Sequence, residues 1–278
     1  MFKGQVWWVT GASSGIGTGL AEALSRHGAN VILSGRNVKA LEAVSSRCKT
    51  ASLILPFEAT DYAEVPGIVE QAWKWSEQHG GRIQGLVNNA GISQRSLAVD
   101  TVFDVYQRII AVDLLAPIAL TQALLPRMVK GGGGNIVAIS SVAGMVGAPL
   151  RSAYSAAKHG LIGYHDSVRA ETSHLGVNVL VVAPGSVRTN VSKNALDAKA
   201  TARGESDQAI ENGMPPDVAA AKILEAVQAG TRELVLAEGM EAEIVKLRRK
   251  DPDALFDLMA NMIAGGYAQR MGAERKPG

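Results

Sequence analysis

The sequence of 278 residues contains a single cysteine, Cys48. One thiol excludes an internal disulfide and fits a reducing compartment, so we expect a cytoplasmic protein. The histidines show no close metal-ligand spacing such as His-Glu-x-x-His, so we expect no bound metal. A chain of this length can bury a core large enough to fold without either kind of cross-link.

An excess of charge of one sign is also lacking. The formal net charge is +2, and no block of like charges occurs, so nucleic acid and an anionic membrane surface are not expected partners. The first apolar run stops at Thr10-Gly11, which is too short for a secretion signal. No uninterrupted apolar run reaches about eighteen residues, so we expect no membrane span.

Short, β-branched apolar runs alternate with longer amphipathic stretches through most of the chain. The apolar runs are nearly continuous, as is typical of parallel strands covered on both faces. We predict strands at 5–9, 30–34, 52–55, 85–87, 135–140 and 177–182, and helices at roughly 15–28, 37–48, 61–79, 102–130 and 152–175. This alternation indicates βαβ units, so the predicted fold class is α/β: a doubly wound, Rossmann-like parallel sheet in a single domain, 1–278.

Two segments depart from this alternation. Segment 190–214 is polar, rich in small residues and without a clear period, so we predict a mobile substrate loop there. Segment 238–278 is predicted to be a helical C-terminal tail, because apolar residues recur in it at i, i+3, i+4 spacing. Such a stripe is most often core or subunit contact, and less often a substrate lid or a membrane-surface helix. We expect a homodimer or homotetramer.

A glycine-rich segment follows the first strand and opens the first helix: Thr10-Gly11-Ala12-Ser13-Ser14-Gly15-Ile16-Gly17. Glycines let the backbone turn tightly and approach a pyrophosphate, and a helix N-terminus offers free N–H groups to the anion. No lysine followed by serine or threonine closes the segment, which excludes a nucleoside-triphosphate P-loop. Its place between a strand and a helix therefore predicts a dinucleotide site.

The second strand ends in Ser34-Gly35-Arg36, where an NAD-binding fold usually places an acidic residue against the ribose diol. Glycine leaves room for a 2′-phosphate, and a guanidinium binds phosphate through paired, charge-assisted hydrogen bonds. The alternative is that Arg36 is a solvated loop residue. We predict NADP(H) as the cofactor.

Further polar segments lie at the ends of later strands: Asn88-Asn89-Ala90-Gly91, Ser140-Ser141 and Pro184-Gly185. In an open α/β sheet the ligand crevice lies at these carboxyl ends. Tyr154 and Lys158 stand four residues apart in a predicted helix, which places them on one face, one turn apart. A free phenol ionises near pH ~10, and a lysine ammonium close by favours the phenolate, so this tyrosine is a candidate acid/base.

Taken together, these motifs resemble the short-chain dehydrogenase/reductase family of the single-domain type, from about Gly4 to Leu236. The family pattern is met by the Thr-Gly-x3-Gly-x-Gly turn, the Asn-Asn-Ala-Gly segment, Ser141, Tyr-x3-Lys, and Pro-Gly with the later Thr189. Any one motif is weak, whereas the ordered set at these separations is highly specific. The sequence past Pro184 is similar to the dehydrogenase/reductase member 7 and hydroxysteroid-dehydrogenase-like branch.

The resemblance implies an oxidoreductase that moves a hydride between nicotinamide and a carbonyl or alcohol. It implies that Tyr154 exchanges a proton with the substrate oxygen, that Lys158 assists it and holds the nicotinamide ribose, and that Ser141 orients the substrate. Glu58 stands where the family usually has aspartate beside the adenine. The cofactor-binding residues it implies are Gly11, Ser13, Ser14, Gly15, Ile16, Gly17, Arg36, Glu58, Ala59, Asn89, Ala90, Gly91, Tyr154, Lys158, Pro184, Gly185, Val187 and Thr189.

One catalytic position departs from the family pattern. Asp113 stands where the family usually has asparagine, whose main-chain carbonyl is thought to hold a water in the proton relay to the lysine. A carboxylate there can pair with Lys158 and weaken its effect on Tyr154, or it can face away and leave only the backbone contact. The sequence leaves both readings open, and Asp113 is kept among the candidate catalytic residues.

Apolar residues flank the catalytic motifs and favour a fairly apolar carbonyl or secondary alcohol as substrate. Besides Ser141 and Tyr154, the predicted substrate contacts are Ile92, Met145 and Ser186. The alternative within the same class is a 3-oxoacyl thioester reductase, which predicts a basic surface near the mouth. The alternative from another class is a catalytically idle NADP-binding regulator, against which the intact serine, tyrosine and lysine argue.

Overall fold

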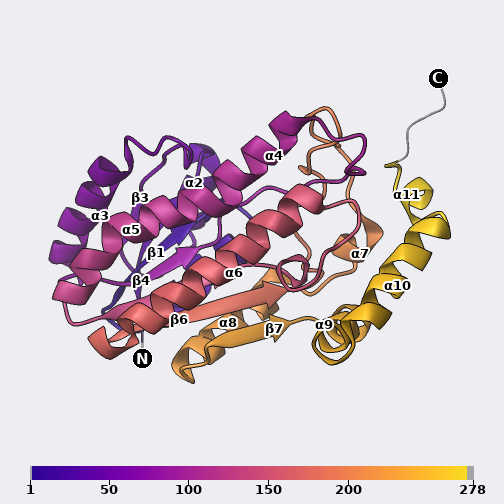
Figure 1. Cartoon of the computed structure of the whole chain (residues 1–278). Helices are drawn as coiled ribbons and strands as arrows, with labels where there is room; N and C mark the ends of the chain where they lie inside the picture. The colour runs from indigo at the N-terminus through magenta and orange to yellow at the C-terminus, as the bar shows by residue number, and fades with distance from the viewer. Residues whose placement is uncertain (1, 274–278) are drawn as a thin grey trace.

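The computed structural model describes residues 2–273 and contains one sheet of seven strands (Figure 1). The strands are β1 (Val6–Thr10), β2 (Asn30–Ser34), β3 (Ser52–Ile54), β4 (Ile83–Asn88), β5 (Gly134–Ile139), β6 (Val177–Pro184) and β7 (Glu233–Leu236). All neighbours pair in parallel, in the order β3-β2-β1-β4-β5-β6-β7. The predicted doubly wound parallel sheet is therefore confirmed, and the chain changes direction across it between β1 and β4.

Helices cover both faces of the sheet (Figure 1). They are α1 (Gly15–Arg26), α2 (Val38–Ser45), α3 (Val65–His79), α4 (Phe103–Ile110), α5 (Ala116–Lys130), α6 (Ser152–Thr172), α7 (Gln208–Glu211), α8 (Pro216–Gln228), α9 (Gly239–Lys250), α10 (Pro252–Ala264) and α11 (Tyr267–Arg270). A π-helical turn, η1 (Ala111–Leu115), joins α4 to α5, and the 3₁₀ turns η2 (Val142–Gly144) and η3 (Ser173–Leu175) flank α6.

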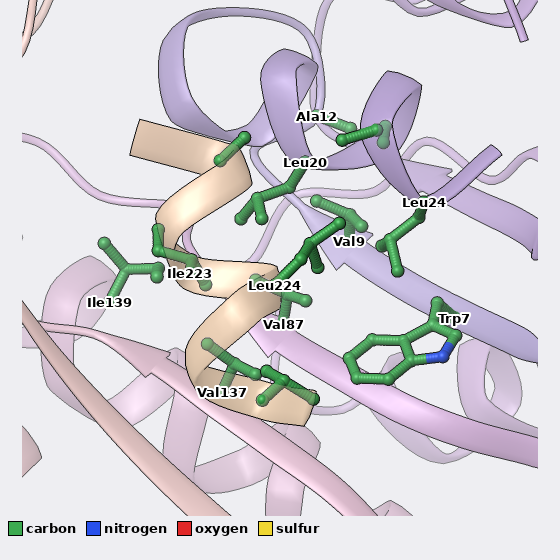
Figure 2. Packing of buried hydrophobic residues seen from close by; sticks show 14 of the residues in the cluster. Trp7, Val9, Ala12, Leu20, Leu24, Val87, Val137, Ile139, Ile223 and Leu224 are labelled. Atoms are coloured by element: carbon green, nitrogen blue, oxygen red, sulfur yellow. The ribbon is translucent and has the colours of Figure 1, made fainter. Parts of the chain in front are cut away.

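The two faces of β1 build two halves of the core. Trp7 and Val9 pack with α1 and α8 on one face, and Figure 2 shows them beside Leu20, Leu24 and Leu224. Trp8 packs on the other face, with residues of α3 and α5, and its indole N–H donates to Ser34 Oγ at 2.8 Å. Both tryptophans are fully buried. Burying each large apolar side chain contributes roughly 1.5–3 kcal/mol.

Helix α8 and strand β7, which complete the last βαβ unit, are not among the elements that the sequence predicts. The short edge strand β7 contains the exposed Glu233, and α8 is rich in alanine, so neither gives a strong apolar pattern. Helix α8 nevertheless packs tightly on α1. An added side chain at Gly19 of α1 would lie 2.7 Å from the Pro216 carbonyl oxygen, so a glycine is required at this crossing.

The rod α4–η1–α5 is the longest continuous helical segment. Its 28 residues have a mean hydropathy of 1.8 in the most apolar window, so by length and composition it is the one described helix that is able to cross a membrane. No membrane span is expected from the sequence, because polar residues interrupt every apolar run. The mean hydropathy of an 18-residue window tolerates such interruptions, and this helix therefore meets the criterion. In the structure one side of α5 covers the sheet, with α3 and α6 as neighbours. A core helix of a globular protein has the same properties.

The two segments set apart in the sequence lie at the same end of the molecule. Segment 190–214 forms turns, isolated bridges and α7 beside the strand ends; its predicted mobility stays a prediction. The tail is helical over α9, α10 and α11, as predicted, and its residues 274–278 lie outside the described part. Leu255 and Met259 of α10 pack with Val146 after η2, so this part of the stripe is an internal contact, whereas Leu258 is exposed.

Candidate active site

A cavity of about 1000 Å³ opens at the carboxyl ends of the strands. Its wall combines the glycine-rich turn, the ends of β2, β4, β5 and β6, the π-helical turn and the first turns of α6. This is the place where an open α/β sheet binds its ligand. The predicted residues that line it are Gly11, Ser13, Ser14, Gly15, Ile16, Arg36, Glu58, Ala59, Asn89, Ala90, Gly91, Ile92, Asp113, Tyr154, Lys158, Pro184, Gly185, Val187 and Thr189.

The glycine-rich turn has the shape of an anion cradle. Gly11 and Gly15 have φ of +63° and +57°, and an added Cβ at Gly15 would lie 2.7 Å from Thr189 Cγ2. Ser14 is extended and makes no side-chain cap with any described residue, so the first N–H groups of α1 are free for a phosphate. Gly17 lies behind the cavity wall, where it allows α1 to approach the Gly11 carbonyl.

A hydrogen-bond frame joins the ends of β1 and β4. Asn89 Nδ2 donates to the carbonyls of Thr10 and Gly11, at 2.9 and 3.2 Å. Thr10 Oγ1 accepts from the N–H groups of Asn89 and Ala90, at 3.0 and 3.1 Å, and donates to Val87 O. The Asn89 side chain thus fixes the turn. The Thr10 hydroxyl is a positioning group that our sequence analysis did not single out, although the Thr-Gly motif carries it.

Arg36 and Glu58 form the nucleotide end of the cavity. Their side chains are 74% and 47% exposed, and Arg36 Nη1 lies 3.6 Å from Glu58 Oε2. Glu58 Oε1 also accepts from the Thr60 hydroxyl, so the carboxylate has a second partner. Arg36 is therefore available to a ligand, and a phosphate here would compete with an exposed carboxylate.

Tyr154 and Lys158 lie at the inner end of the cavity, one turn apart on α6. Lys158 Nζ is 5.6 Å from the centre of the Tyr154 ring, and both side chains are mostly buried. Lys158 Nζ donates to the Ile139 carbonyl at the end of β5, at 3.0 Å. Ser140 Oγ donates to the Lys158 carbonyl, at 3.0 Å. The strand end therefore holds the lysine beneath the tyrosine.

Asp113 pairs with this lysine. The π-helical turn carries the buried Asp113, whose Oδ2 lies 3.2 Å from Lys158 Nζ. Asp113 Oδ1 accepts the Ile92 N–H at 2.8 Å. An added Cβ at Gly91 would lie 2.8 Å from Asp113 Oδ2, so the residue before Ile92 must be small. Of the two readings left open by the sequence, the structure therefore has the carboxylate facing Lys158.

Burial and mutual attraction act in opposite directions on this pair. Burial alone lowers the pKa of Lys158, but the Asp113 carboxylate and Tyr154 raise it, and the net direction is upward. Burial raises the pKa of Asp113, against the pull of Lys158 and of the Ile92 N–H. The pair therefore keeps a fixed positive charge under the tyrosine while placing a compensating negative charge beside it.

Three predicted substrate residues lie outside the lining of this cavity, as far as residues 2–273 show it. Ser141 accepts the Ala143 N–H at 3.1 Å and donates to Pro184 O at 3.4 Å, so its hydroxyl is engaged within the protein. Met145 packs with the tail cluster around α9 and α10. Ser186 Oγ donates to Glu241 Oε1 of α9 at 2.9 Å. Only Ile92 and Tyr154 of the predicted substrate set line the cavity.

The parallel sheet, the glycine cradle and the tyrosine–lysine pair define a nucleotide-dependent oxidoreductase of the short-chain type. A family model described as short chain dehydrogenase matches residues 5–200, and the chain belongs to the short-chain dehydrogenase/reductase family. Dehydrogenase/reductase SDR family member 7B of Bos taurus is 38% identical over 258 residues, covering 91% of this chain and 79% of that protein. Dehydrogenase/reductase SDR family member 7 of Homo sapiens is 41% identical over 205 residues, covering 71% and 59%. The predicted branch is confirmed.

Solved structures share the fold. A short chain dehydrogenase/reductase of Burkholderia phymatum in complex with NAD superposes with a TM-score of 0.79 at 20% identity, covering 91% of this chain and 95% of that one. A short chain dehydrogenase of Burkholderia cenocepacia in complex with NADP gives 0.77 at 24% identity, covering 93% and 98%. The fold therefore occurs with either dinucleotide.

Proposed function

We propose that this protein is an NADP(H)-dependent oxidoreductase that interconverts a carbonyl and an alcohol, with Tyr154 as the proton donor and acceptor. The observation that carries the proposal is the tyrosine–lysine pair on α6, buried at the inner end of a cavity that begins at a glycine cradle. An idle nucleotide-binding regulator needs no such proton donor.

The nucleotide end supports NADP(H) over NAD(H). Position 35 is a glycine, so no carboxylate faces the ribose diol there, and Arg36, which is 74% exposed and lies 3.6 Å from Glu58, can bind a 2′-phosphate. The cradle residues Gly11, Gly15 and the N-terminus of α1 fit the pyrophosphate. The Burkholderia cenocepacia relative in complex with NADP is consistent with this choice.

Bound nicotinamide supplies the hydride in reduction and accepts it in oxidation. In reduction the carbonyl carbon gains that hydride, and the oxygen takes the proton of the Tyr154 hydroxyl. The positive charge of Lys158 stabilises the phenolate left behind, which solvent reprotonates. The Ile139 carbonyl and Asp113 hold that charge in place. Ser141 joins the substrate oxygen only if its hydroxyl leaves the Pro184 carbonyl.

The test is turnover of NADPH with a panel of aldehydes, ketones and quinones, in the wild type and in Tyr154→Phe. We expect wild-type turnover and a loss of at least ~10² in kcat in the phenylalanine variant. NADPH affinity, measured by fluorescence titration, should be nearly the same in both. Tight NADPH binding without turnover of any substrate by the wild type would favour the regulator, and a fully active phenylalanine variant would remove Tyr154 from the mechanism.

A further inference from the structure

Three arginines converge on one carboxylate beside the inner end of the cavity. Arg203 Nη1 lies 2.8 Å from Asp207 Oδ1, and Arg151 Nη2 lies 3.6 Å from Asp207 Oδ2. Arg95 also forms an ion pair with Asp207 Oδ2. The side chains of Arg95 and Asp207 are each 4% exposed, so the centre of the cluster is shielded from water. These four residues form what we call the arginine cluster.

Positive charge exceeds negative charge in the arginine cluster. One buried carboxylate serves three guanidinium groups, and the nearby Glu205 is exposed and acts on Arg203. Burial, together with the charges of Arg151 and Arg203, lowers the pKa of Arg95 to about 9, against the opposing effect of Tyr267. Arg95 Nε has no hydrogen-bond partner among residues 2–273. A buried excess of cations is unfavourable unless an anion completes it.

Arg151 is the member of the arginine cluster that reaches the cavity. It lines the wall together with Tyr154 and Lys158, and it precedes Tyr154 by three residues at the start of α6. Arg151 is the N-cap residue of that helix, with the non-helical backbone angles φ −135° and ψ 33°. Three residues span at most ~11 Å, so an anion bound by Arg151 at the cavity wall lies close to the proton donor.

In the part of the chain that the structure describes, each of the other cationic side chains of the cavity wall has a carboxylate partner that it does not share with a second cation. Arg36 pairs with Glu58, and Lys158 pairs with Asp113. Arg108 lies 3.8 Å from Asp104 and donates to the Ala200 carbonyl at 2.9 Å. Among residues 2–273 the Arg151 guanidinium, in contrast, has only a 3.6 Å ion pair with Asp207 Oδ2, an oxygen that Arg95 also contacts, while Arg203 binds Oδ1. It therefore keeps the largest share of its charge for a ligand.

We propose that Arg151 binds an anionic group of the substrate, a carboxylate or a phosphate, held a few bonds from the reacting carbonyl. This proposal rests on the proposed function, which it makes more specific. A guanidinium binds either anion through two parallel hydrogen bonds, and the Arg151 side chain is 22% exposed, so a ligand can reach it. Arg95 and Arg203 occupy Asp207 and so keep it from neutralising Arg151. Apolar wall residues, Ile92, Leu196 and Ile210, are left for the rest of the molecule.

The experiment compares three para-substituted aldehydes with NADPH: 4-carboxybenzaldehyde, its methyl ester, and 4-formylphenyl phosphate. The ester group activates the aldehyde more than a carboxylate does, so a preference for the acid runs against intrinsic reactivity. We expect kcat/KM at least ~10-fold higher for one of the anions than for the ester. The anion with the higher ratio identifies carboxylate or phosphate as the group recognised.

Variants assign that preference to Arg151. Arg151→Gln should lower the anion-to-ester ratio about 10- to 100-fold, as expected for loss of a charge-assisted pair. Arg151→Lys should restore part of it, and Arg47→Gln, which removes an exposed arginine paired with Glu22 on α1, should keep the wild-type ratio. Circular dichroism and thermal unfolding show whether each variant is folded. An equal ratio in the wild type and Arg151→Gln overturns the proposal.

A binding measurement separates this proposal from the proposed function. Calorimetric titration of the NADPH-loaded enzyme with 4-(hydroxymethyl)benzoate and with its methyl ester forms a complex that cannot react, so the measurement needs no turnover. Tighter binding of the acid that is lost in Arg151→Gln supports the anion site, even if none of the aldehydes is reduced and the proposed function fails. Reduction of all three aldehydes without preference, with equal binding of acid and ester, leaves the proposed function standing and overturns the anion site.

Discussion

Replacing Asp113 by asparagine tests how the buried carboxylate acts on the proton donor. Asparagine keeps an oxygen for the Ile92 N–H, removes the negative charge 3.2 Å from Lys158 Nζ and places an amide NH2 group there instead. The charge of Lys158 then acts on Tyr154 without compensation. The phenolate becomes easier to form, and the rate of alcohol oxidation, which needs the deprotonated base, should rise at lower pH.

The size of the effect follows from the distances. Asp113 Oδ2 is 3.2 Å from Lys158 Nζ, which is 5.6 Å from the centre of the tyrosine ring. The carboxylate therefore lies at most about 9 Å from the centre of the ring, and two charges at that separation interact by about 2 kcal/mol at an effective dielectric constant of about 20. Water in the open cavity reduces this to about 1 kcal/mol. Since one pH unit corresponds to about 1.4 kcal/mol, the ascending limb should move by ~0.5–1 unit.

The assay is the pH dependence of kcat for alcohol oxidation under saturating NADP⁺, in the wild type, Asp113→Asn and Asp166→Asn. Asp166 is an exposed carboxylate of α6 that pairs with Arg169, and its loss should leave the profile in place. Because the carboxylate raises the pKa of Lys158 against burial, Asp113→Asn should also lower the pH at which activity falls at the alkaline end. A profile that superimposes on the wild type, or an ascending limb that moves to higher pH, would refute the reasoning.

Two further predictions concern the nucleotide end and the core. Arg36→Ala should weaken the binding of NADPH by roughly 10- to 150-fold and leave the binding of NADH nearly unchanged, whereas Glu58→Gln should tighten the binding of NADPH slightly. Fluorescence titration measures these affinities. Equal weakening of both cofactors by Arg36→Ala would mean that Arg36 has a structural role. Burial lowers the pKa of His165 from its ordinary value of about 6.5 to about 4. Between these values the unfolded chain binds a proton that the folded protein does not. The free energy of unfolding should therefore fall by about 2 kcal/mol between pH 7 and pH 5. In denaturant titrations His165→Gln should lose most of that pH dependence, and an equal slope in both proteins would contradict it.

Six of the seven strands could be predicted because their apolar runs are long and almost uninterrupted. β7 could not, because it is a four-residue edge strand that contains exposed and half-buried residues. The helical rod at 102–130 was predicted within one residue, but its π-helical turn was not. A one-residue change of hydrogen-bond register leaves no mark in an apolar pattern, yet it is this turn that carries Asp113.

Most of the residues that line the cavity could be predicted because they stand within a few positions of a strand end, where sequence order and spatial order agree. The residues predicted to contact the substrate do not obey this rule. Met145 and Ser186 are adjacent to the catalytic motifs in sequence, but both contact the C-terminal tail. Met145 packs in an apolar cluster with α9 and α10, and Ser186 donates a hydrogen bond to Glu241. The arginine cluster brings together positions 95, 151, 203 and 207, which come from three different connections. No spacing in a single sequence indicates such a cluster.

The paired charges around Tyr154 favour one direction of the reaction. A phenol beside an uncompensated ammonium loses its proton readily and serves oxidation, whereas in this protein the Asp113 carboxylate lies 3.2 Å from that ammonium and offsets its charge. Reduction needs the protonated form, and a 2′-phosphate contact at Arg36 would select NADPH, so both ends of the cavity favour a reductase. This is also testable with Asp113→Asn: at neutral pH the ratio of reduction rate to oxidation rate should fall in the variant. A ratio that stays constant while both rates change would mean that the carboxylate positions Lys158 without setting the direction.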